Sequence, residues 1–266
     1  PLANGIVDYL ELNSVRVFGP DKYASQLESS KIFARDLMNE YKIPQPKYKK
    51  CSSKEEAMHI KDNWGLPLVI KADGLAAGKG VIICTDENSF NDAMNAMFDQ
   101  PQFGEASKFV SIEEYLMGEE LSVFAVCDGE NYKILNTAQD HKRVYDGDKG
   151  PNTGGMGAFS PPRVWDQNMK DKIMDLVIRP VIDGMRTDHE PFMGTLFAGM
   201  MITNEGPKVV EFNCRLGDPE TQVLLPLLES DLLDIVESCV NGTLESSDVK
   251  WSSNSSVAIV LASGGY

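Results

Sequence analysis

The segment from residue 69 to residue 81 combines residue types that are suited to binding phosphate. An apolar run leads into Lys71 and then into a loop of small residues that carries Gly74, Gly78, Lys79 and Gly80. Glycine lets backbone N–H groups approach an oligophosphate closely, and the lysines supply positive charge. The loop alone is equally consistent with a glycine-rich turn between two strands. Lys71 favours the phosphate interpretation, because an unpaired buried ammonium group is costly and needs an anionic partner.

This segment matches neither of two common phosphate-binding motifs. A Walker A loop has four residues between its glycines and a Ser or Thr after its lysine, whereas Gly74 and Gly78 enclose three residues. Gly80 follows Lys79 directly. The dinucleotide pattern also fails, because Ile83 stands where its third glycine is required. Neither motif therefore identifies the phosphate ligand.

A second group of chemically suited residues lies in the segment 207–221. Strand alternation counted from Val209 predicts one polar and one apolar face, with Glu211, Asn213 and Arg215 on the first and Val210, Phe212 and Cys214 on the second. A carboxylate and an amide oxygen suit Mg²⁺, which completes its shell with substrate phosphates and water. The arginine suits negative charge on a transferring phosphoryl group. The alternative is a solvated ion pair between Glu211 and Arg215 on a surface sheet.

Residues 110–123 have the pattern of a strand, a linker and another strand, which is suited to binding adenosine. The linker backbone can offer N–H and C=O groups to an adenine edge, and a carboxylate can accept both ribose hydroxyls. The candidates are Glu113, Glu114, Tyr115 and Leu116 for adenine and Glu120 for ribose. Acidic residues in a surface connection are usually only solvated. The segment therefore indicates a nucleotide site only together with the other two groups.

Taken in order along the chain, these motifs resemble those of ATP-grasp ligases, with Lys31 as a further phosphate-binding lysine. Three more segments narrow the resemblance: Gln139-Asp140-His141-Lys142-Arg143, the glycine-rich segment 150–158, and Arg215-Leu216-Gly217-Asp218-Pro219-Glu220. They resemble the phosphoribosylamine-glycine ligases, also called glycinamide ribonucleotide synthetases. The match covers nearly the whole chain. It implies an ATP-grasp fold of the α/β (α+β) class, in which two lobes clamp ATP.

The resemblance also implies a reaction. ATP, with Mg²⁺ or Mn²⁺, drives the joining of glycine to 5-phosphoribosylamine through glycyl phosphate, giving glycinamide ribonucleotide, ADP and phosphate in de novo purine biosynthesis. Lys31, Lys71 and the glycine loop would hold the ATP phosphates, and Glu211 and Asn213 the metal. Arg215 would stabilise the transferring group, and Asp218 would orient or deprotonate the amine.

The substrate site implied by the resemblance lies in the polar, glycine-rich segment 139–158. Its candidate residues are Asp140, His141, Lys142, Arg143, Asn152, Thr153, Gly154 and Gly155. Which of them contact glycine and which contact the ribose phosphate stays open. One departure from the ATP-grasp pattern is that residues 197–203 carry no acidic residue, so a second metal position is not assigned.

Two other functions fit parts of the pattern. A different ATP-grasp carboxylate-amine ligase or carboxylase would keep the nucleotide motifs but not the segments 140–143 and 217–220. A non-catalytic nucleotide-binding module would require a broken lysine or metal set. Lys71, Glu211, Asn213 and Arg215 are all present, which favours an enzyme.

The composition of the chain narrows its partners and its compartment. The formal net charge of -15 over 266 residues opposes general binding to nucleic acid or to anionic membranes. The five cysteines form no C-x-x-C pair and stand apart from the three histidines, so neither a zinc site nor a disulfide framework is expected. No apolar run of the sequence approaches the length of a membrane span. We therefore expect a cytoplasmic enzyme.

Hydrophobic periodicity predicts a mixed α/β chain that positions these groups. Helices are expected near 22–41, from the capping box at 53–56 to Trp64, and near 88–99, 168–186 and 231–241. Strands are expected near 67–71, 81–84, 109–115, 121–127, 132–136, 195–203 and 207–213. The elements between 53 and 99 would form a small lobe that closes over ATP.

Three divisions of the chain are expected. Residues 1–30 are predicted to end an N-terminal α/β domain, because 15–20 has the pattern of a last strand whose partners are absent. Residues 31–250 would form the ATP-grasp domain, with a small lobe at about 50–112 and a larger lobe at about 113–250. Residues 251–266 would begin a C-terminal lid domain, starting with a strand at 257–262. The resemblance implies the same flanking domains, and whether the full chain is fused to other purine-pathway domains stays open.

Overall fold

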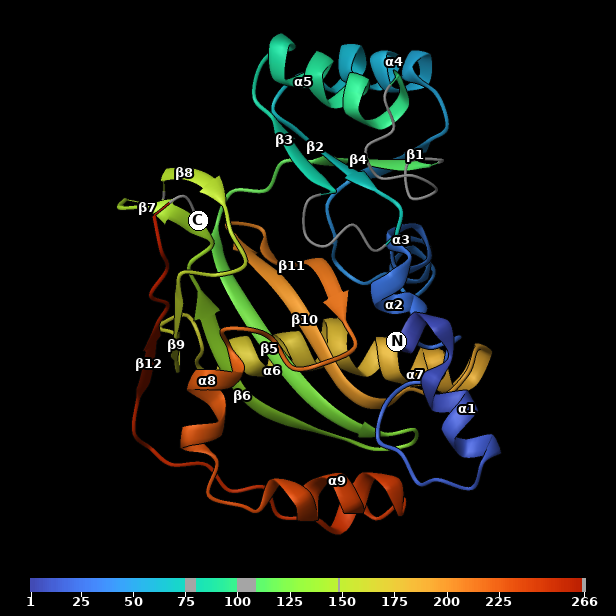
Figure 1. Cartoon of the computed structure of the whole chain (residues 1–266), viewed down its shortest axis with the longest axis vertical. Coiled ribbons are helices and arrows are strands. Elements are labelled where there is room, and N and C mark those ends of the chain that lie inside the picture. The colour runs from blue at the N-terminus through green and yellow to red at the C-terminus, as the bar shows by residue number, and fades with distance from the viewer. Residues whose placement is uncertain (75–79, 100–108, 148, 265–266) are drawn as a thin grey trace.

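The computed structural model describes residues 1–74, 80–99, 109–147 and 149–264 (Figure 1). A large sheet forms the centre of the molecule and a smaller sheet lies above it in this view. The large sheet has six strands in the order β11-β10-β5-β6-β9-β12. Its strands are β5 (Glu119–Asp128), β6 (Tyr132–Asp140), β9 (Gly157–Ser160), β10 (Met193–Thr203), β11 (Gly206–Asn213) and β12 (Ser256–Ile259). Every neighbouring pair in this sheet is antiparallel.

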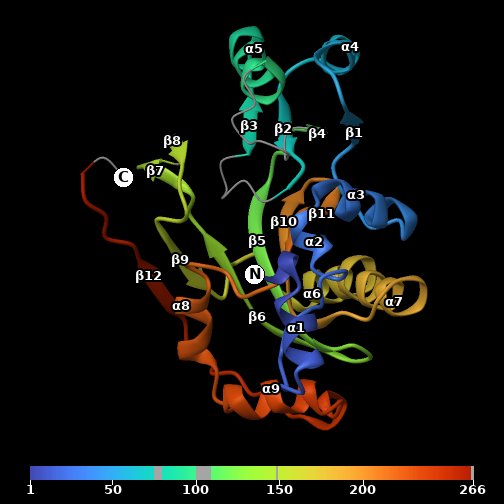
Figure 2. The same cartoon turned by 45° about the vertical axis from the view of Figure 1, so that its right-hand side comes forward.

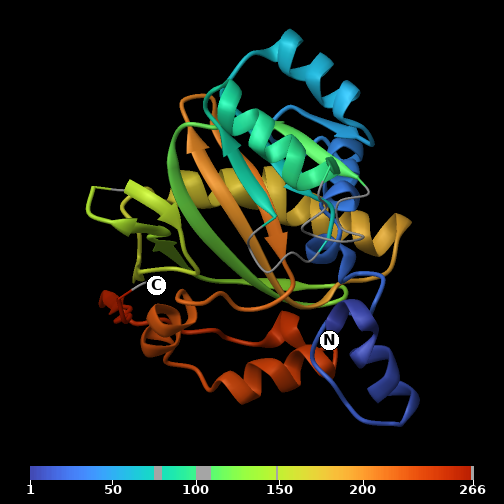
Figure 3. The same ribbon diagram turned by 45° about the horizontal axis from the view of Figure 1, so that its top comes forward.

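The small sheet has the strand order β1-β4-β2-β3, and its strands are β1 (Tyr48–Cys51), β2 (Leu68–Ala72), β3 (Val81–Cys84) and β4 (Val110–Glu114). Two helices, α4 (Lys54–Trp64) and α5 (Glu87–Met94), cover its outer face, away from the large sheet (Figures 1 and 3). A π-helical turn, Asn95–Asp99, extends α5. Ile70, Phe90 and Ile112 are buried between sheet and helices, so this lobe has a hydrophobic core of its own.

Helices cover both faces of the large sheet, and the two faces have separate cores (Figure 2). One face packs against a long helical segment made of α6 (Gln167–Ile173), a π-helical turn (Met174–Ile178) and α7 (Arg179–Asp188). The other packs against α8 (Thr221–Leu224) and α9 (Leu232–Val240). Alternate residues of a strand face opposite sides of the sheet, so Val123 and Ala125 of β5 belong to the first core and Phe124 and Val126 to the second. No described helix has both the length and the apolar character that a membrane crossing requires.

The remaining elements lie at the edges of the two sheets. A hairpin of β7 (Arg143–Tyr145) and β8 (Lys149–Asn152) projects beside the large sheet. At the other side are α1 (Ile6–Leu12), α2 (Gln26–Ser29) and α3 (Lys31–Glu40). Short 3₁₀ turns span Leu2–Asn4, Leu225–Leu227 and Leu244–Ser246.

The single helix expected near 22–41 is two helices in the structure. Ser30 between them has extended backbone, with φ −130° and ψ 111°, and its hydroxyl accepts a hydrogen bond from the N–H of Phe33. Ser30 is therefore the N-cap of α3, a position that serine favours because its oxygen satisfies a free N–H of the first turn. The break matters for the site, because it makes Lys31 the first residue of a new helix.

The strand expected at 15–20 does not form: these described residues belong to no ladder, and Phe18 packs into the core beneath α8 and α9. The strand expected at 257–262 does form, as β12, and pairs with β9 at the edge of the large sheet. The division of the chain at residues 30 and 250 stays a prediction.

The alternation predicted from Val209 is wrong because β11 contains a bulge. Gly199 of β10 pairs with Glu211, but the next residue, Met200, pairs with Val209. Val210 is the extra residue, so Val209 and Phe212 face the same buried core although their numbers differ in parity. The predicted grouping of Glu211 with Asn213 is kept, because both lie beyond the bulge.

Candidate active site

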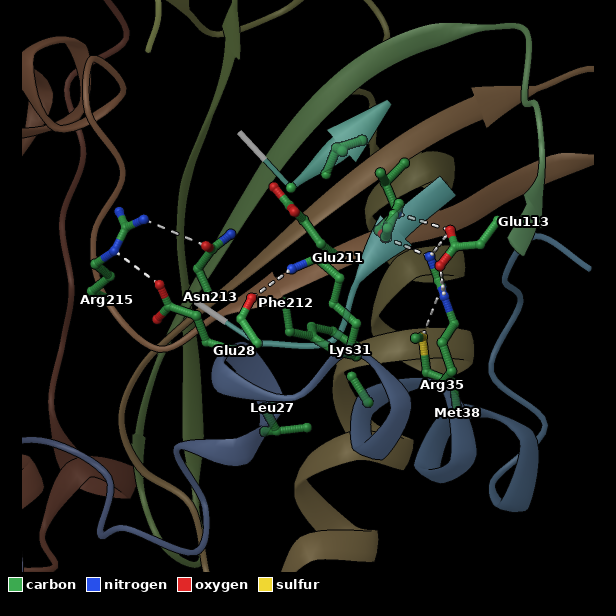
Figure 4. Close-up of a pocket in the computed structure, with 16 residues that line it drawn as sticks. Leu27, Glu28, Lys31, Arg35, Met38, Glu113, Glu211, Phe212, Asn213 and Arg215 are labelled. Carbon is green, nitrogen blue, oxygen red and sulfur yellow. Dashed lines mark hydrogen bonds and ion pairs between the residues drawn. The ribbon is translucent and has the colours of Figure 1, made fainter. Parts of the chain in front are cut away.

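A pocket of about 280 Å³ lies where the small sheet, α2, α3 and β11 meet (Figure 4). It brings together eight of the residues that the sequence singles out: Lys31, Lys71, Gly74, Gly80, Glu113, Glu211, Asn213 and Arg215. These residues come from segments that are far apart in the chain and from both lobes. Gly78 and Lys79, also predicted to bind phosphate, lie outside the described residues.

Lys71, at the inner end of β2, is buried beside a carboxylate and a guanidinium group. Its ammonium nitrogen lies 2.8 Å from Oε2 of Glu113 on β4. Nε and Nη2 of Arg35, on α3, donate to Oε1 and Oε2 of the same carboxylate at 2.9 and 2.6 Å. The exposed fractions of Lys71, Glu113 and Arg35 are 4%, 1% and 2%. The anionic partner that this buried ammonium group needs is thus a carboxylate of the protein, so burial of Lys71 does not by itself indicate a phosphate ligand.

The pKa values of Glu113 and Lys71 are both lowered, but for different reasons. Burial alone would raise the pKa of Glu113, but Lys71 and Arg35 lower it to about 2. Burial lowers the pKa of Lys71, and the attraction of Glu113 opposes this shift. A carboxylate held in its charged form by two cations keeps its negative charge throughout the neutral range.

The bulge in β11 connects this trio to the large sheet. The carbonyl oxygen of Val210 accepts hydrogen bonds from Nη2 of Arg35 at 2.6 Å and from Nζ of Lys71 at 3.1 Å. The carbonyl of Val209 accepts from Nη1 of Arg35 at 3.0 Å, and its N–H donates to the carbonyl of Pro44. β11 is the edge strand of the large sheet, so carbonyl groups on its outer side have no strand partner. At the bulge this edge accepts hydrogen bonds from the buried cations.

Lys31 reaches the pocket from the N-terminus of α3. Asp73, directly after β2, accepts hydrogen bonds from the Ser30 hydroxyl and from the N–H of Ile32, both at 3.1 Å. Nζ of Lys31 donates to the carbonyl of Gly74 at 3.3 Å. The start of α3 is therefore tied to the start of the glycine loop. This places Lys31 and Lys71 on the same pocket, as the phosphate interpretation requires.

Glu211, Asn213 and Arg215 line the same pocket beyond the bulge, and Glu28 of α2 orients the arginine. One oxygen of Glu28 accepts from the N–H of Cys214 at 2.9 Å, and the other from Nε of Arg215 at 3.2 Å. Nη2 of Arg215 lies 3.5 Å from Oδ1 of Asn213. Arg215 is exposed beyond the end of the strand, so its guanidinium group can turn towards a ligand.

The oxygen atoms of Glu211 and Asn213 fit a divalent cation of the hard type. Burial would raise the pKa of Glu211, but the charges of Lys142, Lys71 and Lys31 outweigh it and keep that pKa below its ordinary value. The carboxylate is therefore ionised and available as a ligand. Among the described residues, no cluster of three or more His, Cys, Asp or Glu side chains is arranged for a metal. A cation here would need ligands from elsewhere, such as phosphate oxygens and water.

Lys142 belongs to a second group of charges, which connects the substrate segment to Glu211. Its Nζ lies 3.5 Å from Oε2 of Glu120 and 3.8 Å from Oδ2 of the buried Asp140. Burial would lower the pKa of Lys142, but Asp140, Glu120 and Glu211 raise it. Burial also raises the pKa of Asp140, against the attraction of Lys142. Glu120, predicted to bind ribose, thus lies next to Lys142.

The rest of the predicted substrate segment holds its own backbone in place. Thr153 donates through both its N–H and its hydroxyl to the carbonyl of Lys142, at 2.7 and 2.9 Å. Nη1 of Arg143 donates to the carbonyl of Gly150 at 2.6 Å, which closes the β7–β8 hairpin. The ring of His141 stacks on Phe159 with centroids 5.9 Å apart. Asn152 and Gly154 are exposed.

Gly155 joins this segment to the Gly217-Asp218-Pro219-Glu220 motif. It has φ +126°, and a Cβ there would lie 2.3 Å from Cδ of Pro219, so only glycine fits. Two motifs that are distant in the sequence therefore pack against each other. Asp218 is exposed, and its Oδ1 accepts from Nε2 of Gln222 at 2.5 Å.

The pocket does not include several predicted nucleotide residues. Glu114, Tyr115, Leu116 and Glu120 lie outside its described lining, as does Asp218. The side chain of Glu114 accepts instead from the N–H of Lys47 at 3.1 Å. Their predicted contacts with ATP and with the amine stay predictions.

Two residues of the site were missed in the sequence, Arg35 and Glu28. Arg35 occupies a buried position of α3 between Ile32 and Met38, which are both core residues. A charged residue in the apolar stripe of a helix is a signal for a buried ion pair, because such a residue is rarely buried without one. Glu28 has no comparable signal, since it belongs to a short helix and its partners are distant in the chain.

Comparisons with known proteins agree with this geometry. The family described as phosphoribosylglycinamide synthetase, ATP-grasp (A) domain, matches residues 29–221. The chain is 46% identical over 266 residues to phosphoribosylamine–glycine ligase of Mesorhizobium japonicum, covering 100% of this chain and 62% of that protein. It is also 46% identical to the bifunctional purine biosynthetic protein ADE1 of Schizosaccharomyces pombe, of which it covers 34%.

Solved structures show the same fold. The crystal structure of phosphoribosylamine–glycine ligase from Thermotoga maritima superposes with a TM-score of 0.84 at 36% identity, covering 94% of this chain and 63% of that one. A biotin carboxylase from Campylobacter jejuni superposes with a TM-score of 0.74 at 16% identity, which is evidence for the fold alone. These comparisons confirm the ATP-grasp fold predicted from the sequence. The chain spans less than two thirds of the length of these ligases.

Proposed function

Since this chain belongs to the phosphoribosylglycinamide synthetase ATP-grasp family, we propose that it catalyses the ATP-dependent joining of glycine to 5-phosphoribosylamine, giving glycinamide ribonucleotide, ADP and phosphate. One observation carries the proposal. A single pocket is lined by two lysines suited to phosphate, Lys31 and Lys71, by a carboxylate and an amide suited to a metal, Glu211 and Asn213, and by Arg215. Each group answers one need of phosphoryl transfer to a carboxylate.

The reaction has two steps, because hydroxide is a poor leaving group from a carboxylate. A carboxylate oxygen of glycine attacks the γ-phosphorus of ATP, and ADP leaves with the bonding electrons. The amine of 5-phosphoribosylamine then attacks the carbonyl carbon of glycyl phosphate, and phosphate leaves as the amide forms. Lys31 and Lys71 neutralise charge on the ATP phosphates in both the bound and the reacting state. Arg215 stabilises the charge that develops on the transferring group.

A divalent cation, Mg²⁺ or Mn²⁺, would be held by Glu211 and Asn213 and would neutralise phosphate charge when bound. The hydrogen bond from Arg215 to Asn213, at 3.5 Å, is long enough to be given up without a large loss. Arg215 would then stay in position through the hydrogen bond from its Nε to Glu28.

We assign the remaining predicted roles as proposals. The linker segment 113–116 would contact adenine through its backbone, and Glu120 the ribose hydroxyls. The segments 140–143 and 152–155 would form the substrate site, with Asp218 next to the amine. The packing of Gly155 on Pro219 supports a shared site, because it fixes the two motifs relative to each other.

An isotope experiment tests the reaction. Glycine labelled with oxygen-18 in its carboxylate, ATP, Mg²⁺ and 5-phosphoribosylamine are supplied to the protein expressed from its complete reading frame. One labelled oxygen should appear in the released phosphate for each molecule of product. Label that stays wholly in glycine and product would refute an acyl phosphate. ADP release with other carboxylates or amines, but not with this pair, would identify a different ATP-grasp ligase.

The setting of the reaction is also a proposal. All five cysteines are unbridged and buried, which fits a reducing compartment, and we propose that the protein acts in the cytoplasm. Similarity to a bifunctional purine biosynthetic protein supports fusion to other domains of this pathway in the full protein. We further propose the division into a small lobe at about 50–112 and a larger lobe at about 113–250, flanked by further domains.

A further inference from the structure

Arg35 lies at the pocket, yet it has no donor left for a ligand. Nε is bound to Glu113, and Nη2 is bound to Glu113 and to the carbonyl of Val210. Nη1 is bound to the carbonyl of Val209 at 3.0 Å and to Oε1 of Gln45 at 3.4 Å. These contacts use all the N–H groups of a guanidinium. Arg35 therefore cannot donate a hydrogen bond to a bound anion and can act on it only through its charge and its contacts with neighbours.

Glu113 is likewise fully engaged. Its Oε1 accepts from Nε of Arg35 and from the Ser111 hydroxyl, and its Oε2 accepts from Nη2 of Arg35 and from Nζ of Lys71. An ionised carboxylate has about four acceptor positions, and these contacts fill them. Its side chain is therefore unsuited to bind a ribose or a metal, although it belongs to the segment predicted to hold adenine.

Lys71 is the member of the trio that keeps a donor. Its ammonium group has three N–H donors. The described residues take two of them, Oε2 of Glu113 at 2.8 Å and the carbonyl of Val210 at 3.1 Å. No described residue accepts from the third, and Lys71 lines the pocket. The trio thus faces the pocket with one donor and, counting its three ionised groups, with one net positive charge.

We infer that Arg35 is a positioning residue that neutralises Glu113, so that the positive charge of Lys71 acts on an anionic ligand. Without Arg35, Lys71 and Glu113 would form an isolated ion pair with no net charge. Such a pair attracts phosphate only weakly, because the carboxylate repels the phosphate that the ammonium attracts. The inference rests on the proposed function in one respect, since it takes the ligand to be the phosphate groups of ATP.

A purely structural role is the competing explanation. Arg35 joins α3, the small sheet and the bulge of β11, so its loss would also loosen the packing of the two lobes. The two explanations predict different ATP binding when Glu113 is removed in addition to Arg35. Restoring the charge balance would restore ATP binding if Arg35 acts through charge, but not if it acts only as a mechanical link.

The test compares Arg35→Met, Glu113→Gln and the double variant by calorimetric titration with ATP in the presence of Mg²⁺. Arg35→Met should raise the Kd for ATP by about tenfold or more, because the net charge of the trio falls from one positive charge to zero. Glu113→Gln should bind ATP at least as tightly as the wild type. The double variant, with the same net charge at the trio as the wild type, should return to within about threefold of it.

Thermal unfolding of each variant separates binding from folding. A folded double variant that binds ATP as weakly as Arg35→Met would overturn the inference, and so would a Glu113→Gln variant with a tenfold higher Kd. If Arg35→Met does not fold, Arg35→Lys distinguishes the two explanations, because lysine keeps the positive charge but cannot make all the hydrogen bonds of the guanidinium group. Its Kd should stay near the wild-type value, and a tenfold rise would overturn the inference. A folded wild-type protein that binds no ATP would instead refute the proposed function.

Discussion

Lys71 and Lys142 both act on the carboxylate of Glu211, yet their own pKa values shift in opposite directions. Lys71 is buried, with a side-chain exposure of 4%, and its one carboxylate partner is shared with Arg35. Its pKa is lowered, mainly by burial. Lys142 has a side-chain exposure of 40%, and four carboxylates, Asp140, Glu120, Glu211 and Glu220, outweigh burial and raise its pKa.

The difference shows how the surroundings of a lysine decide the use of its charge. Around Lys142 the acids outnumber the cation, so its charge serves to hold Asp140, Glu120 and Glu211 together. The ion-pair partner of Lys71, Glu113, is already neutralised by Arg35, so the lysine has charge to offer to a ligand. We therefore expect Lys71 to act on ATP and Lys142 to act on the arrangement of the site. The four predictions below test this contrast.

The largest effect is expected at Glu211, which lies between the two lysines. Glu211→Gln should reduce turnover by more than about 100-fold, since it removes the charge of a proposed metal ligand and even outer-shell changes cost up to that much. Steady-state ADP release at saturating ATP, over a series of Mg²⁺ concentrations, measures it. Glu205→Gln is the matched control, because Glu205 is on the same hairpin but is exposed and pairs with Lys208. Full activity in Glu211→Gln would remove Glu211 from the metal site.

Arg215 differs from both lysines, because it is exposed and forms an ion pair with Glu28. Arg215→Ala should lower kcat by about 100-fold, the cost of one lost donor to a developing charge, while the Kd for ATP changes little. Single-turnover rates and calorimetric titration measure the two quantities. Arg186→Ala, which removes an exposed arginine of α7, serves as the control. Equal losses in kcat and in ATP affinity would show that Arg215 binds the ground state.

The two lysines themselves provide the direct comparison. Lys71→Ala should raise the Kd for ATP by about tenfold to 100-fold, because it removes a charge-assisted contact with phosphate and leaves Arg35 paired with Glu113. Lys142→Ala should raise it by less than about threefold and should mainly affect the apparent KM of the other substrates. Titration of both variants with ATP decides this. Similar losses of ATP affinity would contradict the contrast.

The smallest effect is expected in acid unfolding. The pKa of Glu113 is about 2 in the folded protein against 4.5 for an ordinary glutamate, so its contribution to stability is present above pH 4.5 and is lost as the pH falls towards 2. Glu113→Gln removes this dependence. The shift in the acid midpoint should be about half a pH unit or less, because 40 acidic residues titrate together. Circular dichroism between pH 2 and 5 measures the midpoint, and an unchanged midpoint in Glu113→Gln would contradict the low pKa.

Features that depend on residue type and short spacing were predictable from the sequence. The two strands that flank the glycine loop and the cap at Ser53 form as expected, because local periodicity and capping chemistry need no distant partner. The order of the ATP-grasp motifs along the chain likewise identified the family, and the comparisons confirm it.

Only the tertiary structure decided how these groups are paired. Arg35 meets Glu113 across 78 positions of sequence, and Glu28 meets Arg215 across 187. The bulge at Val210 shifts the register of β11, and the carbonyl of Val210 there binds the buried cations. Each depends on the approach of separate elements, which is set by packing over the whole domain. Residue types therefore determined which chemistry the chain can perform, and long-range packing determined which charges remain available for it.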